Sequence, residues 1–173
     1  MESYSVLMSV YNKENPSYLR ASIQSMLDQT VSFHDFVLVC DGPLNPELEQ
    51  VISDFTKHAN AFKVVRLKEN LGLGPALNAG LSYCQCDLVA RMDSDDLSLP
   101  DRCARQLQCF ASHPELAIVS GFVTEFAADP CNPGRTRTVP EYQEEIKAFA
   151  AKRSPFNHPC VMYRKSMVLN AGS

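Results

Sequence analysis

The feature that most constrains the fold is a regular alternation of short apolar runs and helical patterns. The apolar, β-leaning runs lie at residues 5–10, 36–40, 62–67 and 88–92. Each precedes a segment in which apolar side chains recur at helical spacing. Asn15-Pro16 and Asn45-Pro46 place a capping side chain directly before a proline, a combination favoured in the first turn of a helix. Strands that alternate with helices predict an α/β fold with a mostly parallel central sheet and helices on both faces.

The last third of the chain has a weaker pattern. After a helix over residues 100–110, we expect a strand at 118–123, a helix at 142–152 and a short strand at 161–163. The polar segment 127–138 contains prolines and glycine and is typical of a mobile loop.

Length and charge exclude several classes of protein. A chain of 173 residues suits a single domain, and its net charge of -4 gives no electrostatic reason to expect a nucleic-acid partner. No apolar run approaches the ~20 residues that a membrane span needs, and Met1 is not followed by a signal-peptide pattern. We therefore expect a cytoplasmic protein, with any membrane contact peripheral. The spacing of the seven cysteines fits neither a zinc site nor a disulfide framework.

A concentration of charged side chains directly follows the fourth apolar run, in Arg91-Met92-Asp93-Ser94-Asp95-Asp96. Carboxyl ends of parallel strands are where open α/β sheets bind ligands. Carboxylates this close repel each other unless a cation lies among them, and Mg²⁺ or Mn²⁺ prefers such oxygens, with substrate phosphates completing the shell. The alternative is a solvated acidic turn that caps the next helix.

Other polar groups follow the neighbouring strands. Tyr11 comes after the first strand, Asp41 after the second and Asn70 after the third. Because these strand ends meet at one edge, we expect their side chains to share a crevice with Asp93 and Asp95. An aromatic ring with a carboxylate that accepts an N–H bond suits a planar nucleobase such as uracil, and the metal pair suits its diphosphate.

Familiar phosphate-binding and hydrolase motifs are absent from the sequence. No Gly-x-x-x-x-Gly-Lys-Ser/Thr loop occurs, and Leu77 stands where the third glycine of Gly-x-Gly-x-x-Gly belongs. No Gly-x-Ser-x-Gly elbow occurs either. A cation rather than a glycine-rich loop is therefore expected to hold the phosphates.

Several of these motifs together resemble a known family. They occur in the order Val10-Tyr11-Asn12, Asp41-Gly42, Asn70-Leu71-Gly72, Ala76-Leu77-Asn78-Ala79-Gly80-Leu81, the acidic run from Arg91 with Pro100, Arg102 and Gln106, Ser154-Pro155-Phe156-Asn157-His158-Pro159, and Val161-Met162. Nearly the whole chain is similar to family 2 glycosyltransferases with the nucleotide-diphospho-sugar (GT-A) fold. The subgroup that builds bacterial exopolysaccharides such as amylovoran is the most similar.

The resemblance implies roles for individual residues. The nucleotide-binding set would be Ser9, Val10, Tyr11, Asp41, Asn70, Asp93 and Ser94. Asp95 would bind the Mg²⁺ or Mn²⁺ ion that bridges the diphosphate, with Asp93 meeting the ribose or a metal-bound water. His158 would lie on the acceptor side. Residues 1–96 would form the nucleotide-binding half of one GT-A domain, and residues 97–173 the start of the acceptor-side half, incomplete at the C-terminus.

The resemblance also implies a reaction. A nucleotide-diphospho-sugar, expected to be a UDP-sugar, would donate its sugar with inversion to a saccharide or lipid-linked saccharide at the inner face of the membrane. A carboxylate would deprotonate the acceptor hydroxyl. In this subgroup the base belongs to a Glu-Asp pair that the sequence has not reached by Ser173, so we expect the chain to bind donor and transfer sugar poorly. The alternatives are a non-catalytic nucleotide-sugar-binding module and a metal-dependent nucleotidyltransferase.

Overall fold

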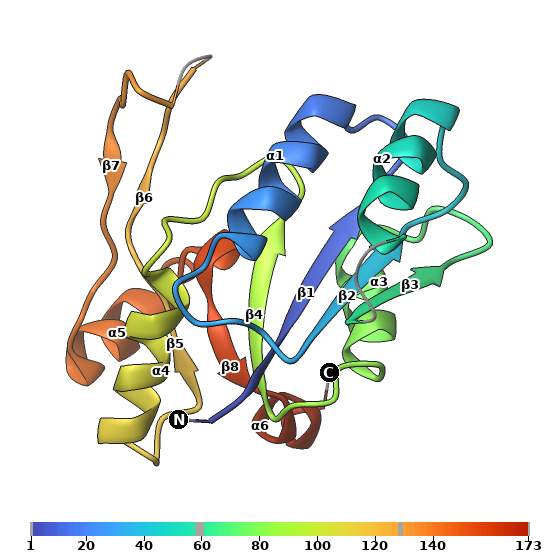
Figure 1. Ribbon diagram of the computed structural model, residues 1–173. Coiled ribbons are helices and arrows are strands. Elements are labelled where there is room, and N and C mark those ends of the chain that lie inside the picture. Colours follow the sequence, from blue (N-terminus) through green and yellow to red (C-terminus); the bar gives the residue numbers. More distant parts are fainter. Residues whose placement is uncertain (1, 58–60, 128–129, 173) are drawn as a thin grey trace.

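A six-stranded sheet in the order β3-β2-β1-β4-β8-β5 forms the middle layer of the computed structural model, which describes residues 2–57, 61–127 and 130–172 (Figure 1). The strands are β1 (Tyr4–Val10), β2 (Asp35–Cys40), β3 (Phe62–Arg66), β4 (Leu88–Asp93), β5 (Ile118–Val119) and β8 (Met162–Arg164). The first four strands are parallel, and β8 is antiparallel to both β4 and β5. The prediction of a mostly parallel α/β sheet is confirmed.

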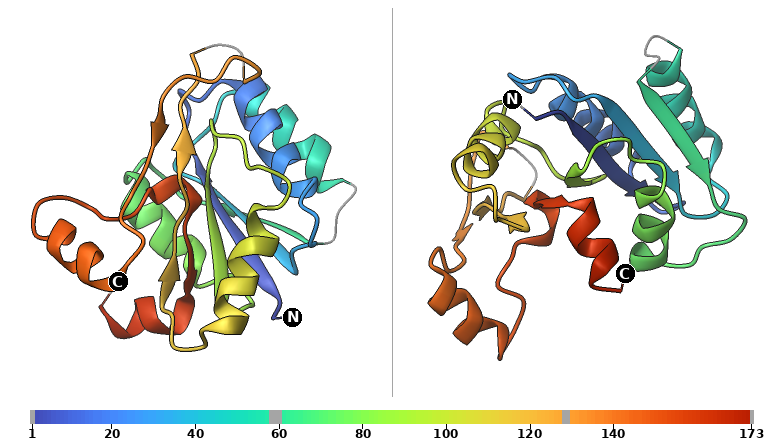
Figure 2. Two further views of the ribbon diagram at one scale, coloured as in Figure 1. Left: turned by 90° about the vertical axis from the view of Figure 1, so that its left-hand side faces the viewer. Right: turned by 90° about the horizontal axis from the view of Figure 1, so that it is seen from below.

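Helices cover both faces of this sheet (Figures 1 and 2). The helices α1 (Pro16–Leu27), α2 (Pro46–Thr56) and α4 (Arg102–Ser112) pack on one face, and α3 (Leu73–Leu81) and α6 (Lys165–Asn170) pack on the other. The Asn15 side chain accepts the backbone N–H of Ser17, and the Asn45 side chain accepts that of Leu48. Both asparagine caps therefore satisfy amides that a helix leaves free at its start. None of the described helices combines the length and apolarity that crossing a bilayer requires.

The strands alternate their side chains between two apolar cores. On one face, Leu38 and Ala90 are buried with Ile23 of α1 and Leu107 of α4. On the other, Leu7 and Val39 are buried with Ala76 of α3. Both faces of β1, β2 and β4 are thus covered, which explains why these strands read as continuous apolar runs.

The segment after α4 departs from the predicted elements. The strand expected at 118–123 splits into β5 and β6 (Val123–Thr124), and β6 pairs with β7 (Thr136–Arg137) in a separate two-stranded sheet. The break has a tertiary cause, because Asn157, from a distant part of the chain, binds the intervening loop. Its backbone N–H donates to Ser120 Oγ (3.1 Å) and its Nδ2 donates to the Gly121 carbonyl (2.8 Å).

Part of the loop expected at 127–138 is therefore a strand, and its residues 128–129 lie outside the described residues. Helix α5 (Gln143–Ala150) is shorter than predicted, and a turn of 3₁₀ helix, η1 (His158–Cys160), precedes β8. Helix α6 was not predicted. These elements place the β6–β7 hairpin and α5 beside the outer end of the sheet (Figures 1 and 2).

Candidate functional site

The carboxyl ends of β1, β2 and β4 bring five predicted site residues to one edge. Ser9 lies opposite Asp93 in the β1–β4 register, and Val10 lies opposite Cys40 in the β1–β2 register. The Asp41 backbone N–H donates to the Val10 carbonyl (2.8 Å). Tyr11 follows directly and is 45% exposed, so part of its ring is available to a ligand.

The carboxylate of Asp41 is buried and already has partners. Its Oδ1 accepts the Leu71 amide (2.8 Å) and its Oδ2 accepts the Gly72 amide (3.0 Å). The exposed Asn70 donates from Nδ2 to the Asp41 carbonyl at 3.4 Å. A carboxylate has about four acceptor positions, so Asp41 retains capacity for a further N–H donor. Asp41 therefore also organises the loop between β3 and α3.

Gly42 allows the loop between β3 and α3 to approach the end of β2 closely. Its φ of 87° lies in the left-handed region, and a Cβ atom would stand 2.8 Å from the Asn70 nitrogen. A side chain here would both strain the backbone and separate the two loops. The Asp41-Gly42 pair is therefore needed for the contact between the β2 and β3 ends.

Three carboxylates gather just beyond β4. Asp93, Asp95 and Asp96 each offer an oxygen, and these oxygens all lie within 4.8 Å of one another. Burial raises the pKa of Asp95, and the negative charges of Glu14 and Asp93 raise it further. Burial likewise raises the pKa of Asp96, followed by the charges of Asp93 and Asp95. A set of hard oxygens under mutual repulsion fits a divalent cation such as Mg²⁺ or Mn²⁺. Asp96 lies in the predicted acidic run, but the sequence assigned it no ligand role.

Arg91 compensates only one of these carboxylates by direct contact. Its side chain is buried, at 1% exposure, and its Nη2 forms an ion pair with Asp93 Oδ1. The Nε and Nη1 atoms have no hydrogen-bond partner among the described residues. Arg91 is thus buried beside the acidic turn rather than exposed on the outside of the sheet. The arginine therefore offsets the charge of Asp93 most directly, and neither Asp95 nor Asp96 forms an ion pair among the described residues.

Glu14 joins the acidic turn to the loop after β1. Ser94, predicted to bind the nucleotide, is buried and donates from Oγ to Glu14 Oε2 (2.6 Å). This bond fixes the backbone around Asp93 and Asp95 relative to the start of α1. No local sequence signal marks Glu14, because its partner Ser94 lies 80 residues further along the chain.

Asp95 and Asp96 line a cavity of about 520 Å³. It extends toward Tyr18 of α1, Thr124 of β6 and Pro159 of η1, and the residues that line it do not include Tyr11 or Asp41. The edge thus offers two neighbouring surfaces: the Tyr11–Asp41 side, and a hollow that runs from the carboxylates toward the β6–β7 hairpin.

His158 lies in η1, next to β4. The pKa of His158 is below its ordinary value because burial disfavours the charged imidazole, and the nearby Arg91 adds to this effect against the opposing charge of Asp93. The imidazole is therefore neutral at pH 7 and lies within electrostatic range of the Arg91–Asp93 pair.

Comparison with known proteins places these features in a family context. The family model described as "Glycosyl transferase family 2" matches residues 5–170. The amylovoran biosynthesis glycosyltransferase AmsE of Erwinia amylovora is 43% identical over 172 residues, which cover 98% of this chain and 63% of that protein. An Escherichia coli protein named UDP-Gal:alpha-D-GlcNAc-diphosphoundecaprenol beta-1,3-galactosyltransferase is 36% identical over 169 residues, which cover 98% and 61%.

A solved structure shares the fold. The mannosyltransferase PcManGT from Pyrobaculum calidifontis, in complex with GDP-Man and Mn²⁺, superposes with a TM-score of 0.71 at 14% sequence identity. The match covers 99% of this chain and 47% of PcManGT. The chain therefore spans about 60% of the length of the curated relatives described above, and about half of this structural neighbour.

Proposed function

Because the chain belongs to the family 2 glycosyl transferases, we propose that it binds a nucleotide-diphospho-sugar, a UDP-sugar above all, through a divalent cation at Asp95 and Asp96. In the whole protein, the bound sugar would pass with inversion to a saccharide or lipid-linked saccharide. The observation that carries the proposal is the cluster of Asp93, Asp95 and Asp96 at the carboxyl end of β4, next to the ends of β1 and β2.

The two sides of the edge suit the two parts of a nucleotide. The exposed ring of Tyr11 offers a face for a base, and Asp41, with the backbone of Ser9 and Val10 beside it, offers an acceptor for a base N–H. Asn70, which lies in the loop between β3 and α3, donates to the Asp41 carbonyl beside this acceptor. Asp93, held by Arg91, would accept a ribose hydroxyl, and Ser94 would act through its bond to Glu14.

A cation held by Asp95, Asp96 and Asp93 would be Mg²⁺ or Mn²⁺, and when bound it would neutralise charge on the departing nucleotide diphosphate. The mannosyltransferase neighbour, whose structure contains Mn²⁺ with GDP-Man, supports this choice of ion. The residues of this chain supply the rest of the donor site: they orient the base, the ribose and the diphosphate relative to the sugar.

The acceptor side is also a proposal. Inversion requires a carboxylate to take the proton of the attacking hydroxyl, and the resemblance assigns that base to a position beyond Ser173. His158, near Arg91 and Asp93, would border the acceptor. The name of the Escherichia coli relative, which specifies a diphosphoundecaprenol-linked acceptor, supports a lipid-linked substrate. With such an acceptor, the protein would work at the inner face of the membrane.

The test is a calorimetric titration of UDP with and without Mn²⁺. We expect UDP to bind in the presence of Mn²⁺ and this binding to be lost in chelator. Asp95→Asn and Asp96→Asn should each weaken Mn²⁺-dependent binding by tenfold or more, on the order of 1.4 kcal/mol. Asp101→Asn is the matched control, because Asp101 is an exposed carboxylate paired with Arg105 on α4. Equal UDP binding in chelator would contradict the proposal, and preference for a nucleoside triphosphate would favour a nucleotidyltransferase.

A further inference from the structure

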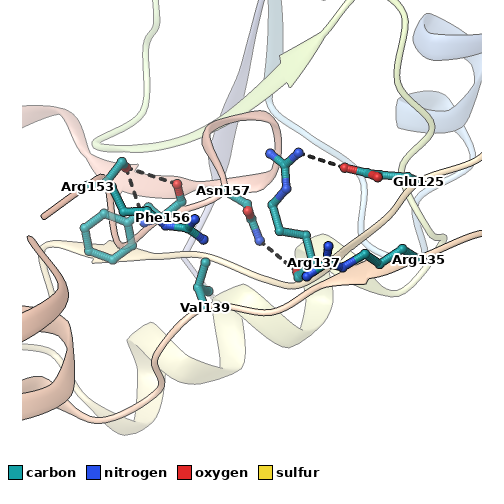
Figure 3. Close-up of a pocket in the computed structure, with 8 residues that line it drawn as sticks. Glu125, Arg135, Arg137, Val139, Arg153, Phe156 and Asn157 are labelled. Carbon is teal, nitrogen blue, oxygen red and sulfur yellow. Dashed lines mark hydrogen bonds and ion pairs between the residues drawn. The ribbon is translucent and has the colours of Figure 1, made fainter.

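A second cavity, of about 510 Å³, lies between the β6–β7 hairpin and the segment that follows α5 (Figure 3). Three arginines line it, together with one carboxylate, one aromatic ring and three further residues: Glu125, Arg135, Arg137, Val139, Arg153, Ser154, Phe156 and Asn157. Arg135 and Arg137 come from the hairpin, whereas Arg153 and Phe156 come from the opposite wall. Such a concentration of cations is unexpected in a chain with a net charge of -4.

The positive charge of this cavity is only partly compensated. Arg137 Nη2 pairs with Glu125 Oε1 at 2.7 Å. Arg153 lies over the ring of Phe149, 4.8 Å from its centroid, and neither Arg153 nor Arg135 forms an ion pair with any of the described carboxylates. One carboxylate therefore faces three guanidinium groups, and the cavity is suited to an anion.

The walls of the cavity are held in place by a buried side chain. Asn157 donates from Nδ2 to the Gly121 carbonyl (2.8 Å) and to the Arg137 carbonyl (3.3 Å), so it ties the start of η1 to β7 at Arg137, two residues after Arg135. It is 5% exposed. The guanidinium groups are therefore presented from a supported backbone, which lowers the entropic cost of binding.

This arginine cavity adjoins the hollow that Asp95 and Asp96 line. Glu125 and Arg137 belong to the walls of both. A molecule that lay across the boundary would have one end among arginines and the other beside the carboxylates to which we assign the metal. The chain thus offers two places for phosphate: one that needs a cation to offset the aspartates, and one that is itself cationic.

We propose that the arginine cavity binds the phosphate groups of the acceptor, as found in a saccharide linked to a lipid through a diphosphate. This inference rests on the proposed function. The donor diphosphate belongs with the cation at Asp95 and Asp96, so the arginines remain for a second anion. A guanidinium group can donate two parallel N–H bonds to a phosphate, which fixes the orientation of the phosphate in addition to compensating its charge. With its phosphates held there, the acceptor sugar would extend past Glu125 and Arg137 toward the donor.

The experiment uses the whole protein in the presence of chelator, so that the metal-dependent donor site is not populated. Inorganic pyrophosphate and a short-chain alkyl diphosphate-linked N-acetylglucosamine serve as probes in calorimetric titrations. We expect both to bind, and Arg135→Gln and Arg153→Gln each to weaken binding by about tenfold. Arg105→Gln is the matched control, since Arg105 is an exposed arginine on α4 paired with Asp101.

Two further measurements separate this proposal from its alternatives. UDP binding in Mn²⁺ should be unchanged in Arg135→Gln, which also shows that the variant is folded, while the KM for the lipid-linked acceptor rises and the KM for the donor does not. Pyrophosphate binding that is absent, or equal in all variants, would overturn the inference and leave the donor site intact. Arginine-dependent binding to phosphatidylglycerol vesicles, without binding of either soluble probe, would overturn it in favour of a membrane contact.

Discussion

The aspartates at the strand ends differ because their partners differ. Asp41 accepts two backbone amides, Asp93 contacts a buried arginine, and Asp95 and Asp96 have raised pKa values from burial and neighbouring negative charge. Asp41 therefore holds the loop and Asp93 is offset by Arg91. Under the proposed function, Asp95 and Asp96 are the two that would need an added cation.

Asp41→Asn tests the role of Asp41 in the loop. An amide can offer one acceptor oxygen where the carboxylate offers two, so one of the amides of Leu71 and Gly72 loses its partner. We expect the free energy of unfolding to fall by about 1–3 kcal/mol in urea denaturation and UDP affinity to fall with it. Asp28→Asn, at an exposed carboxylate that accepts a bond from Gln24, should change neither. Unchanged stability of Asp41→Asn would show that the two amide bonds do not hold the loop.

At the scale of single residues, the sequence identified the groups that directly follow strands. It did not identify Glu14 or the arginines of the hairpin cavity. Their roles depend on distant partners: Glu14 on Ser94, and Arg135 on a wall built from residues near 153–157. Strand ends can be located from hydrophobic pattern alone, whereas contacts between segments far apart in sequence need the fold.

Among the elements, α3 packs most closely on the sheet. A Cβ atom at Gly80 would stand 2.5 Å from Val39 Cγ2 and 2.6 Å from Leu7 Cδ1, and both of those side chains are fully buried. The absence of a side chain at this one position sets the distance between α3 and the strands β1 and β2.

Gly80→Ala should therefore destabilise the protein although alanine favours helix. Overpacking costs about 1–3 kcal/mol, and the gain in helix propensity recovers up to about 1 kcal/mol. Gly74→Ala in the same helix is the control, because its Cβ would meet no atom within 4 Å. Urea denaturation should show a loss of stability for the first variant and none for the second. If the two variants had the same free energy of unfolding, α3 would be able to move away from the sheet without loss of stability.

The elements divide into two groups in how well the sequence predicted them. The first four strands and their helices alternate locally, and all were located within a few residues. Two of these helices, α1 and α2, also carry Asn-Pro caps. Beyond α4, strands as short as Thr136–Arg137 owe their existence to a partner rather than to their own pattern. The loop at Ser120–Phe122 likewise depends on hydrogen bonds from Asn157.

Thiol accessibility reports on the molecule as a whole. Cys40, Cys84 and Cys103 are buried, and burial raises the pKa of Cys40 to about 11 and that of Cys84 to about 12. Alkylation requires an accessible thiolate, so these thiols should react only when the layers open. Under native conditions at pH 7.5 we expect iodoacetamide to modify the exposed Cys109, and the buried three only in denaturant, as read by peptide mass spectrometry. Rapid native labelling of Cys84 would contradict the packing of α3 on the sheet.

The position of β8 has a consequence for synthesis of the protein. Leu88 of β4 pairs with Arg164 of β8, so the strand that carries the acidic cluster receives its second neighbour only after α4, the hairpin and α5 have been made. Until then, a nascent chain emerging from the ribosome presents β4 as an open, apolar sheet edge, which invites pairing with other chains. A chain that ends before Met162, through ribosome stalling or proteolysis, would lack β8. We therefore expect it to aggregate rather than to form a smaller nucleotide-binding protein.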